Sequence, residues 1–69
     1  MIQPLSYVHP NAKIADNVVI DPFVTIGKNV EIHPLAYIEK GAEIGDNTHI
    51  GPFCIVRENA KIGKNCKFT

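Results

Sequence analysis

Residues 26–50 read IGKNVEIHPLAYIEKGAEIGDNTHI, and an isoleucine returns at every sixth position of this stretch. The spacing extends outward in both directions until it covers the chain, and every residue in the series is apolar. The series consists of Ile2, Val8, Ile14, Ile20, Ile26, Ile32, Ile38, Ile44, Ile50, Val56, Ile62 and Phe68. A second series of small or slim side chains follows four residues later: Ser6, Ala12, Val18, Val24, Val30, Ala36, Ala42, Thr48, Cys54, Ala60 and Cys66.

A period of six suits a β-strand and not an α-helix. Residues six apart on a helix point about 240° away from each other, so they form no single face. Six is a multiple of the two-residue strand period, so the whole apolar series can face one side. Short strands separated by turns would then stack as coils around a continuous apolar column. The sequence therefore predicts an all-β parallel solenoid with little or no helix.

The repeat units IGKNVE, IGDNTH, AKIGKN and GAEIGD resemble the hexapeptide repeat of the left-handed parallel β-helix. In that family three hexapeptides form one triangular coil, so the resemblance implies a three-sided solenoid of eighteen residues per coil. The 69 residues then make just under four coils. The left hand rests on the resemblance alone, because the general rule for parallel crossovers favours the right hand.

Laying the chain out at eighteen residues per coil aligns side chains of the same kind. The predicted inward columns are Ile2/Ile20/Ile38/Val56, Val8/Ile26/Ile44/Ile62 and Ile14/Ile32/Ile50/Phe68. One predicted corner column holds an asparagine in every coil, at Asn11/Asn29/Asn47/Asn65. Asparagine tolerates the left-handed backbone region that tight corners need, and its amide can hydrogen-bond along a stack.

The opening residues MIQPLSYVHP resemble the start of the UDP-N-acetylglucosamine O-acyltransferases, the first enzymes of lipid A biosynthesis. Residues 11–32 continue the likeness, including the pair Pro22-Phe23. The resemblance implies an acyl-carrier-protein-dependent transfer of a 3-hydroxyacyl group to a sugar nucleotide, by a homotrimer that uses no metal or redox cofactor. In that family a histidine base lies in later coils, in a cleft between subunits. Nothing in residues 1–69 matches its motif, so we assign no catalytic residue.

The chain also repeats itself at an offset of thirty residues. Residues 32–62 match residues 2–32 at thirteen identical pairs, among them Leu5/Leu35, Tyr7/Tyr37 and Phe23/Phe53. Thirty residues are five hexapeptides and not a whole number of coils, so the second copy is rotated onto another side of the triangle. Such an echo of an opening phrase favours recombination or design.

Composition and charge bound the function. The formal net charge is zero and the pI is about 6.8, which argues against a nucleic-acid or membrane-surface binder. No apolar run is long enough to span a bilayer, and the first residues do not resemble a signal peptide. The two cysteines, Cys54 and Cys66, fall on different sides of the triangle, so we expect no disulfide but buried thiols of a cytoplasmic protein.

The candidate functional side chains do not converge in this layout. No histidine among His9, His33 and His49 stacks on another, so the sequence predicts no metal site and no cofactor site. The pair His49 and Glu31 alone resembles an oriented general base, although a surface contact is the simpler interpretation. Four basic residues near the end, Arg57, Lys61, Lys64 and Lys67, could guide an acidic carrier protein, but Glu39 and Asp46 are expected to pair with two of them.

Prolines occupy the corner entries, and apolar residues follow four of them. Leu5, Phe23, Leu35 and Phe53 come directly after Pro4, Pro22, Pro34 and Pro52. Apolar corner residues point outward, so they either make contacts between subunits or fold over the edge of the prism.

Two functions remain open for residues 1–69, which we expect to form one hexapeptide-repeat domain, a truncated or engineered piece of a longer solenoid. The first is the N-terminal β-helix part of a UDP-N-acetylglucosamine O-acyltransferase-like protein, inactive by itself. Acyl carrier protein and a UDP-sugar would then be partners of the full-length enzyme only. The second is a structural, self-associating solenoid without catalytic activity.

The inward columns predict that Ile26→Asp abolishes folding, because it buries an unpaired carboxylate in the middle of a column. Circular dichroism and a thermal melt of the variant test this. A cooperative, native-like melt would contradict the arrangement of the columns.

Overall fold

The computed structural model describes residues 5–68, in which eleven strands of two residues each follow one another at the spacing of the repeat. They are β1 (Tyr7–Val8), β2 (Lys13–Ile14), β3 (Val19–Ile20), β4 (Thr25–Ile26), β5 (Glu31–Ile32), β6 (Tyr37–Ile38), β7 (Glu43–Ile44), β8 (His49–Ile50), β9 (Ile55–Val56), β10 (Lys61–Ile62) and β11 (Lys67–Phe68). The strand expected at Ile2 lies outside the described residues, as does Pro4.

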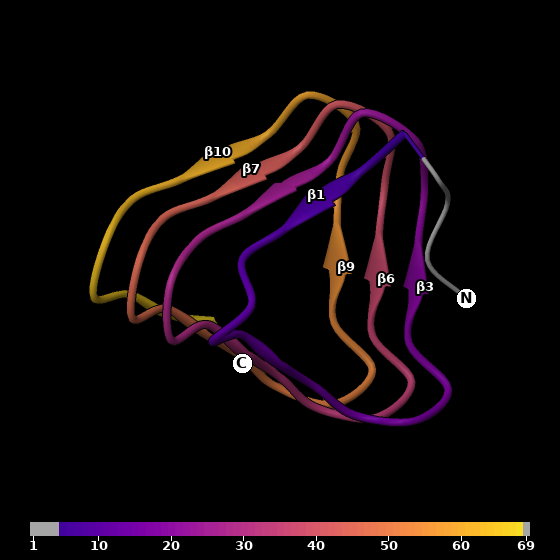
Figure 1. Cartoon of the computed structure of the whole chain (residues 1–69). Helices are drawn as coiled ribbons and strands as arrows, with labels where there is room; N and C mark the ends of the chain where they lie inside the picture. The colour runs from indigo at the N-terminus through magenta and orange to yellow at the C-terminus, as the bar shows by residue number, and fades with distance from the viewer. Residues whose placement is uncertain (1–4, 69) are drawn as a thin grey trace.

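The strands form three parallel sheets, one for each side of a triangular prism (Figure 1). Their orders are β1-β4-β7-β10, β2-β5-β8-β11 and β3-β6-β9. Each strand pairs with the third strand after it, and partners such as Ile20 and Ile38 are eighteen residues apart. No helix occurs in residues 5–68. The three-sided all-β solenoid and its eighteen-residue coil are therefore confirmed.

The apolar series fills the interior of the prism. Its members in the middle coils are almost fully buried, and Ile20, Ile26, Ile38 and Ile50 expose no surface. Towards the ends burial decreases: Val8, Ile14 and Ile62 are half-buried. Phe68 is in register with Ile50 but is 41% exposed, so its predicted burial was wrong. No described coil stacks over β11, and an inward position is covered only where a neighbouring coil lies above it.

Thr48 is the one polar side chain that is fully buried among the described residues. Its hydroxyl donates to the carbonyl of Gly63 at 2.7 Å and accepts from the backbone N–H of Cys66 at 3.3 Å. Both partners belong to the next coil, so the hydroxyl is satisfied and helps to join two coils.

The corners have a regular backbone conformation. At every sixth residue from Asn17 to Asn65 the φ angle is positive, between 58° and 75°. Asparagine or glycine occupies six of these nine positions and adopts the left-handed region at low cost. At four of them, Gly41, Asn47, Asn59 and Asn65, the backbone N–H donates to a carbonyl of the preceding coil, as from Asn47 to Lys28 at 2.8 Å.

Asn11 departs from the predicted asparagine column. Its φ is not positive, and its backbone N–H donates to Nδ1 of His9 at 3.0 Å instead of to a carbonyl of another coil. The local turn closes through the N–H of Ala12 and the carbonyl of His9. Asn17 has a positive φ although no described coil lies below it either, so what distinguishes the corner at Asn11 is the local hydrogen bond to the side chain of His9.

Three left-handed corners carry large apolar residues, namely Phe23, Leu35 and Phe53, with φ of 64°, 68° and 61°. Each follows a proline, in the order that a type II turn requires, but glycine or asparagine is the usual residue at this position. The Cβ atom makes the left-handed region unfavourable by about 1–2 kcal/mol. The side chains of Phe23, Leu35 and Phe53 are also exposed, so packing within the chain offsets little of this backbone strain.

Relief of this strain predicts that Phe23→Asn raises the free energy of unfolding by about 1 kcal/mol. Urea unfolding followed by circular dichroism measures it. Phe23→Ala is the matched control, because it removes the same exposed ring but keeps an unsuitable residue at positive φ. Equal stabilities of the two variants would show that the backbone strain is not released.

Candidate functional site

The predicted histidine–carboxylate pair lies on the surface of one sheet. His49 on β8 is in register with Glu31 on β5, and Nε2 of His49 is 4.0 Å from Oε2 of Glu31. Both side chains are about two-fifths exposed, and Lys67 is the next residue in the same row. Glu31 lines an open depression of about 510 Å³ together with Lys13 and His33, but His49 is not part of its lining, so the geometry of the pair is that of a surface contact. His9 accepts the hydrogen bond from the backbone N–H of Asn11 in the turn described above. His33 does not pair with His9 or His49.

The structure also brings no metal ligands together. Among residues 5–68 no group of three or more histidine, cysteine, aspartate or glutamate side chains could hold an ion. Cys54 and Cys66 are both free thiols. Cys54 is half-buried, but Cys66 is exposed, so its predicted burial was wrong for the same reason as that of Phe68.

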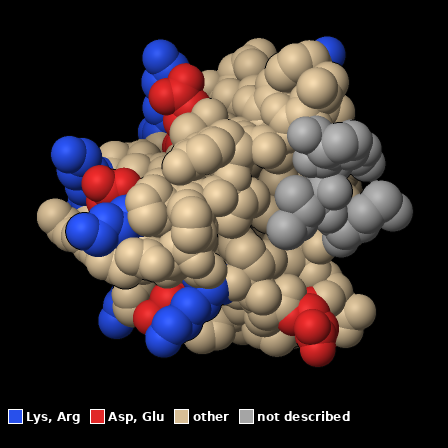
Figure 2. All heavy atoms as spheres, in the orientation of Figure 1, with Lys and Arg blue, Asp and Glu red and all other residues tan. Residues whose placement is uncertain are grey.

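The basic residues near the end are paired in part. Nε of Arg57 lies 3.4 Å from Oε1 of Glu39, as the eighteen-residue layout predicted. The expected pairing of Asp46 with Lys64 was wrong: the Asp46 carboxylate accepts from the backbone N–H of Lys28 at 2.8 Å. It therefore joins a corner to the preceding coil. On the face shown in Figure 2, acidic and basic side chains lie close together in several places along the edge of the molecule.

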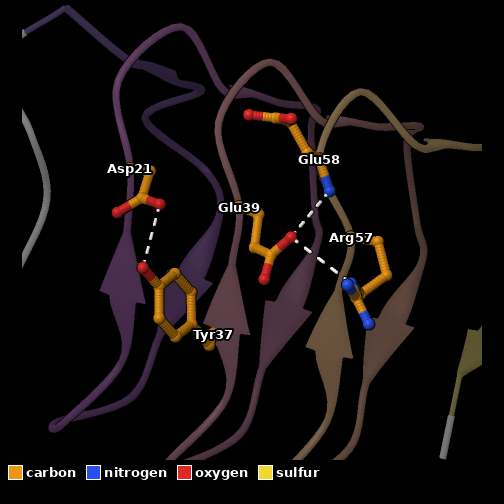
Figure 3. A network of polar contacts seen from close by, with 5 residues as sticks. All are labelled: Asp21, Tyr37, Glu39, Arg57 and Glu58. Atoms are coloured by element: carbon orange, nitrogen blue, oxygen red, sulfur yellow. Dashed lines mark hydrogen bonds and ion pairs between the residues drawn. The ribbon is translucent and has the colours of Figure 1, made fainter.

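A polar row follows the β3-β6-β9 sheet (Figure 3), and the sequence predicted only its Glu39–Arg57 pair and not the contact between Asp21 and Tyr37. Asp21, Glu39 and Arg57 come directly after the three strands, eighteen residues apart. The Tyr37 hydroxyl donates to Oδ2 of Asp21 at 3.0 Å, and the N–H of Glu58 donates to Oε1 of Glu39 at 2.9 Å. These side chains line an open depression of about 430 Å³. In the sequence, this row could have been found from the acidic and basic residues that are spaced eighteen positions apart.

The same sheet has an apolar outer face. Val19, Tyr37 and Ile55 stand next to one another in register on β3, β6 and β9, and all three are exposed. Leu35 and Phe53 project from the corner that precedes the sheet. The outer positions of the other two sheets are mostly charged or polar: Tyr7, Thr25, Glu43 and Lys61 on one, and Lys13, Glu31, His49 and Lys67 on the other.

Comparison with known proteins places this repeat in a family. A model of the bacterial transferase hexapeptide (six repeats) matches residues 23–57 and 41–68. Together the two matches span 46 of the 69 residues. The chain belongs to the bacterial transferase hexapeptide family. Searches of curated proteins and of solved structures gave no match.

Membership in this family confirms that the repeat units resemble the hexapeptide repeat of the parallel β-helix. The matched residues are those that build the coils, and they hold no group of three or more histidine, cysteine, aspartate or glutamate side chains that could bind a metal ion. No helix that could cross a bilayer is found in the described part of the chain. What the surface offers chemically is therefore an apolar face with a mixed polar row at its edge.

The contact with Asp21 predicts a titration effect. The hydrogen bond to the Asp21 carboxylate, and then its negative charge, raise the pKa of Tyr37 above the usual value near 10. Asp21→Asn should lower that pKa, measured by ultraviolet absorbance in a Tyr7→Phe background where Tyr37 alone titrates. Because the pKa is raised in the folded chain, stabilisation from the contact is present below about pH 10 and is lost as the phenol ionises above it.

Glu43→Gln is the matched control for this titration, because it removes one carboxylate from a different sheet. An equal change in the Tyr37 pKa in both variants would contradict the role of the Asp21 contact.

Proposed function

We propose that the chain is the N-terminal β-helix part of an acyltransferase similar to the UDP-N-acetylglucosamine O-acyltransferases, and that it acts in the cytoplasm in lipid A biosynthesis. The observation that carries this is the likeness of residues 1–32 to the start of those enzymes, together with the family match over residues 23–68. The family match supports a transferase scaffold, and the opening phrase supports the choice of substrate class.

In this proposal the described residues supply the scaffold and not the reacting centre. The complete enzyme would let a sugar hydroxyl attack the thioester of acyl carrier protein, forming the ester C–O bond and releasing the carrier thiol. A histidine base in later coils would take the hydroxyl proton, in a cleft between subunits of a homotrimer. In the described residues, His9 accepts a backbone hydrogen bond within a turn, and His49 lies beside Glu31 on the surface of a sheet.

A second candidate is a structural solenoid whose role is self-association, and the apolar face favours it. Five exposed apolar side chains on and beside one sheet form a continuous surface in a chain whose net charge is zero. A monomer rarely exposes such a surface without a use for it. This candidate needs no later coils and no catalytic cleft.

A chimera tests the acyltransferase proposal. Residues 1–32 of this chain replace the first coils of an authentic UDP-N-acetylglucosamine O-acyltransferase, and acyl transfer from 3-hydroxyacyl carrier protein is measured. We expect a folded enzyme that retains transfer within about tenfold, since the replaced coils carry no reacting group. The 69-residue chain alone should show no transfer above the blank.

The control chimera carries Ile20→Asp, which should unfold the grafted coils and abolish transfer. A wild-type chimera that folds but has lost transfer by more than about a thousandfold would overturn the acyltransferase proposal. That result would leave the structural candidate.

A further inference from the structure

The hydrogen bonds between strands all point the same way along the solenoid. A backbone N–H donates to a carbonyl seventeen residues later, as from Glu43 to Ala60 at 2.9 Å and from Gly45 to Ile62 at 2.8 Å. Strand donors therefore face the C-terminal end of the prism, and strand acceptors face the N-terminal end. The two ends of the solenoid are chemically different.

Each end carries backbone groups without a partner within residues 5–68. At the C-terminal end these are the N–H groups of Lys61, Gly63 and Lys67, on and beside β10 and β11. At the N-terminal end they are the carbonyls of Ser6, Val8 and Ala12, on and beside β1 and β2. An unpaired strand edge is a template for pairing with another chain.

The apolar interior is also less well covered at both ends. Val8, Ile14 and Ile62 are half-buried and Phe68 is 41% exposed, whereas the equivalent residues of the middle coils are buried. These side chains lie beside the unpaired backbone groups, so one partner can cover both.

A second copy of the chain fits the C-terminal end when it is placed head to tail. If the coils continue without rotation, β1 of the second copy extends the β1-β4-β7-β10 sheet next to β10, and its β2 extends the next sheet beside β11 (Figure 1). With the same spacing of hydrogen bonds as within the chain, the three unpaired donors meet the three unpaired acceptors in order. Inside the prism, Val8 of the second copy then covers Ile62, and its Ile14 covers Phe68.

The direction of the hydrogen bonds excludes the other end-to-end arrangements. Two C-terminal ends would set N–H against N–H, and two N-terminal ends would set carbonyl against carbonyl. An extended peptide could pair with one side of the triangle only. A coil of the same triangular section pairs with two sides at once and also covers the interior.

One pair of charges opposes this contact. Lys67 on β11 comes into register with Lys13 on β2 of the second copy, and like charges on directly neighbouring strand positions are destabilising. We therefore expect a weak association, with a dissociation constant in the micromolar range or above.

We propose that the C-terminal edge of the solenoid, formed by β10 and β11, is the docking surface for the N-terminal coil of a second copy, in an open head-to-tail stack. The proposal rests on the structural candidate function of the 69-residue chain. Stacking runs along the solenoid axis and leaves the three outer sides available for a side-by-side trimer. In a complete acyltransferase the same donors would instead hold the next coil of the chain.

Sedimentation velocity of the 69-residue chain from about 10 µM to 1 mM tests the stack. A head-to-tail contact does not close, so the mean mass should rise with concentration without a limiting size. A Lys61→Pro variant should associate about tenfold or more weakly, because it removes a donor at the contact that the fold itself does not use.

Lys64→Pro is the matched control for Lys61→Pro. It replaces another lysine of the last coil by proline, at the corner position where other coils carry Pro10, Pro22, Pro34 and Pro52. Its backbone N–H is not one of the donors that the stack uses, so association should change by less than about twofold.

A charge reversal on each side of the contact tests the register. Lys67→Glu should strengthen association by about threefold, because its carboxylate then meets Lys13 of the second copy. Lys13→Glu should act in the same direction. The double variant brings two carboxylates together and should associate no more tightly than the wild type. This pattern requires the two positions to meet across the contact.

A disulfide can report the same register directly. In the stack, Ala12 of the second copy follows Cys66 in its column, at the spacing of neighbouring strands, which a disulfide can bridge. After oxidation of Ala12→Cys with diamide, peptide mass spectrometry should find position 12 of one copy joined to Cys66 of the next. Ala15→Cys is the control, since it makes the same substitution in a different column and should give no such link.

The proposal is overturned if the wild-type chain stays monomeric up to 1 mM or forms only a closed oligomer. It is also overturned by equal effects of Lys61→Pro and Lys64→Pro, or by a link between two Cys66 residues as the main disulfide. Circular dichroism checks the fold of each variant, and the charge and cysteine variants decide if Lys61→Pro does not fold. Acyl transfer by the chimera is measured separately, so a failure of the stack is distinct from a failure of the acyltransferase proposal.

Discussion

The structure depends on backbone hydrogen bonds that join each strand to the strand eighteen residues away. The N–H of Asp21 donates to the carbonyl of Ile38 at 3.0 Å, and that of Glu39 to the carbonyl of Val56 at 2.8 Å. Strands of two residues have no stability of their own, so they exist because each is held by a neighbouring coil. This one register stacks isoleucine on isoleucine inside the prism and sets every outer side chain beside its equivalent in the next coil.

The corners impose a second constraint, which is a positive φ at every sixth residue. Asparagine and glycine meet it with little strain, whereas Phe23, Leu35 and Phe53 do not. The internal repeat at an offset of thirty residues accounts for the Pro-Phe pair at two corners. Phe23 belongs to the first copy of the repeat (residues 2–32), and Phe53 belongs to the second (residues 32–62). The second copy of the phrase is rotated, so Leu35 and Phe53 lie in the corner that precedes Tyr37 and Ile55, whereas Phe23 lies in the corner that follows β3.

Outer positions of the strands are free of the demands of the core, and there the three sides differ. Two sheets present mostly charged and polar residues in mixed order, and the third presents Val19, Tyr37 and Ile55. A hexapeptide solenoid can therefore carry unrelated functions on one scaffold, because changes on its outside leave the columns intact. The polar row from Asp21 to Arg57 shows how regular stacking also turns isolated charges into an ordered array (Figure 3).

The sequence by itself determined the strands, the three sides, the inward columns and most corners, because a fixed register appears in the chain as a fixed period. It also predicted the neighbours His49 and Glu31, and Glu39 and Arg57, since residues one coil apart must be adjacent. Only the tertiary structure decided the exposure of Cys66 and Phe68, the turn at Asn11, the bond from Lys28 to Asp46 and the contact of Tyr37 with Asp21. These features depend on which coil lies above or below a residue and on the direction in which each side chain points. The period of a sequence gives neither kind of information.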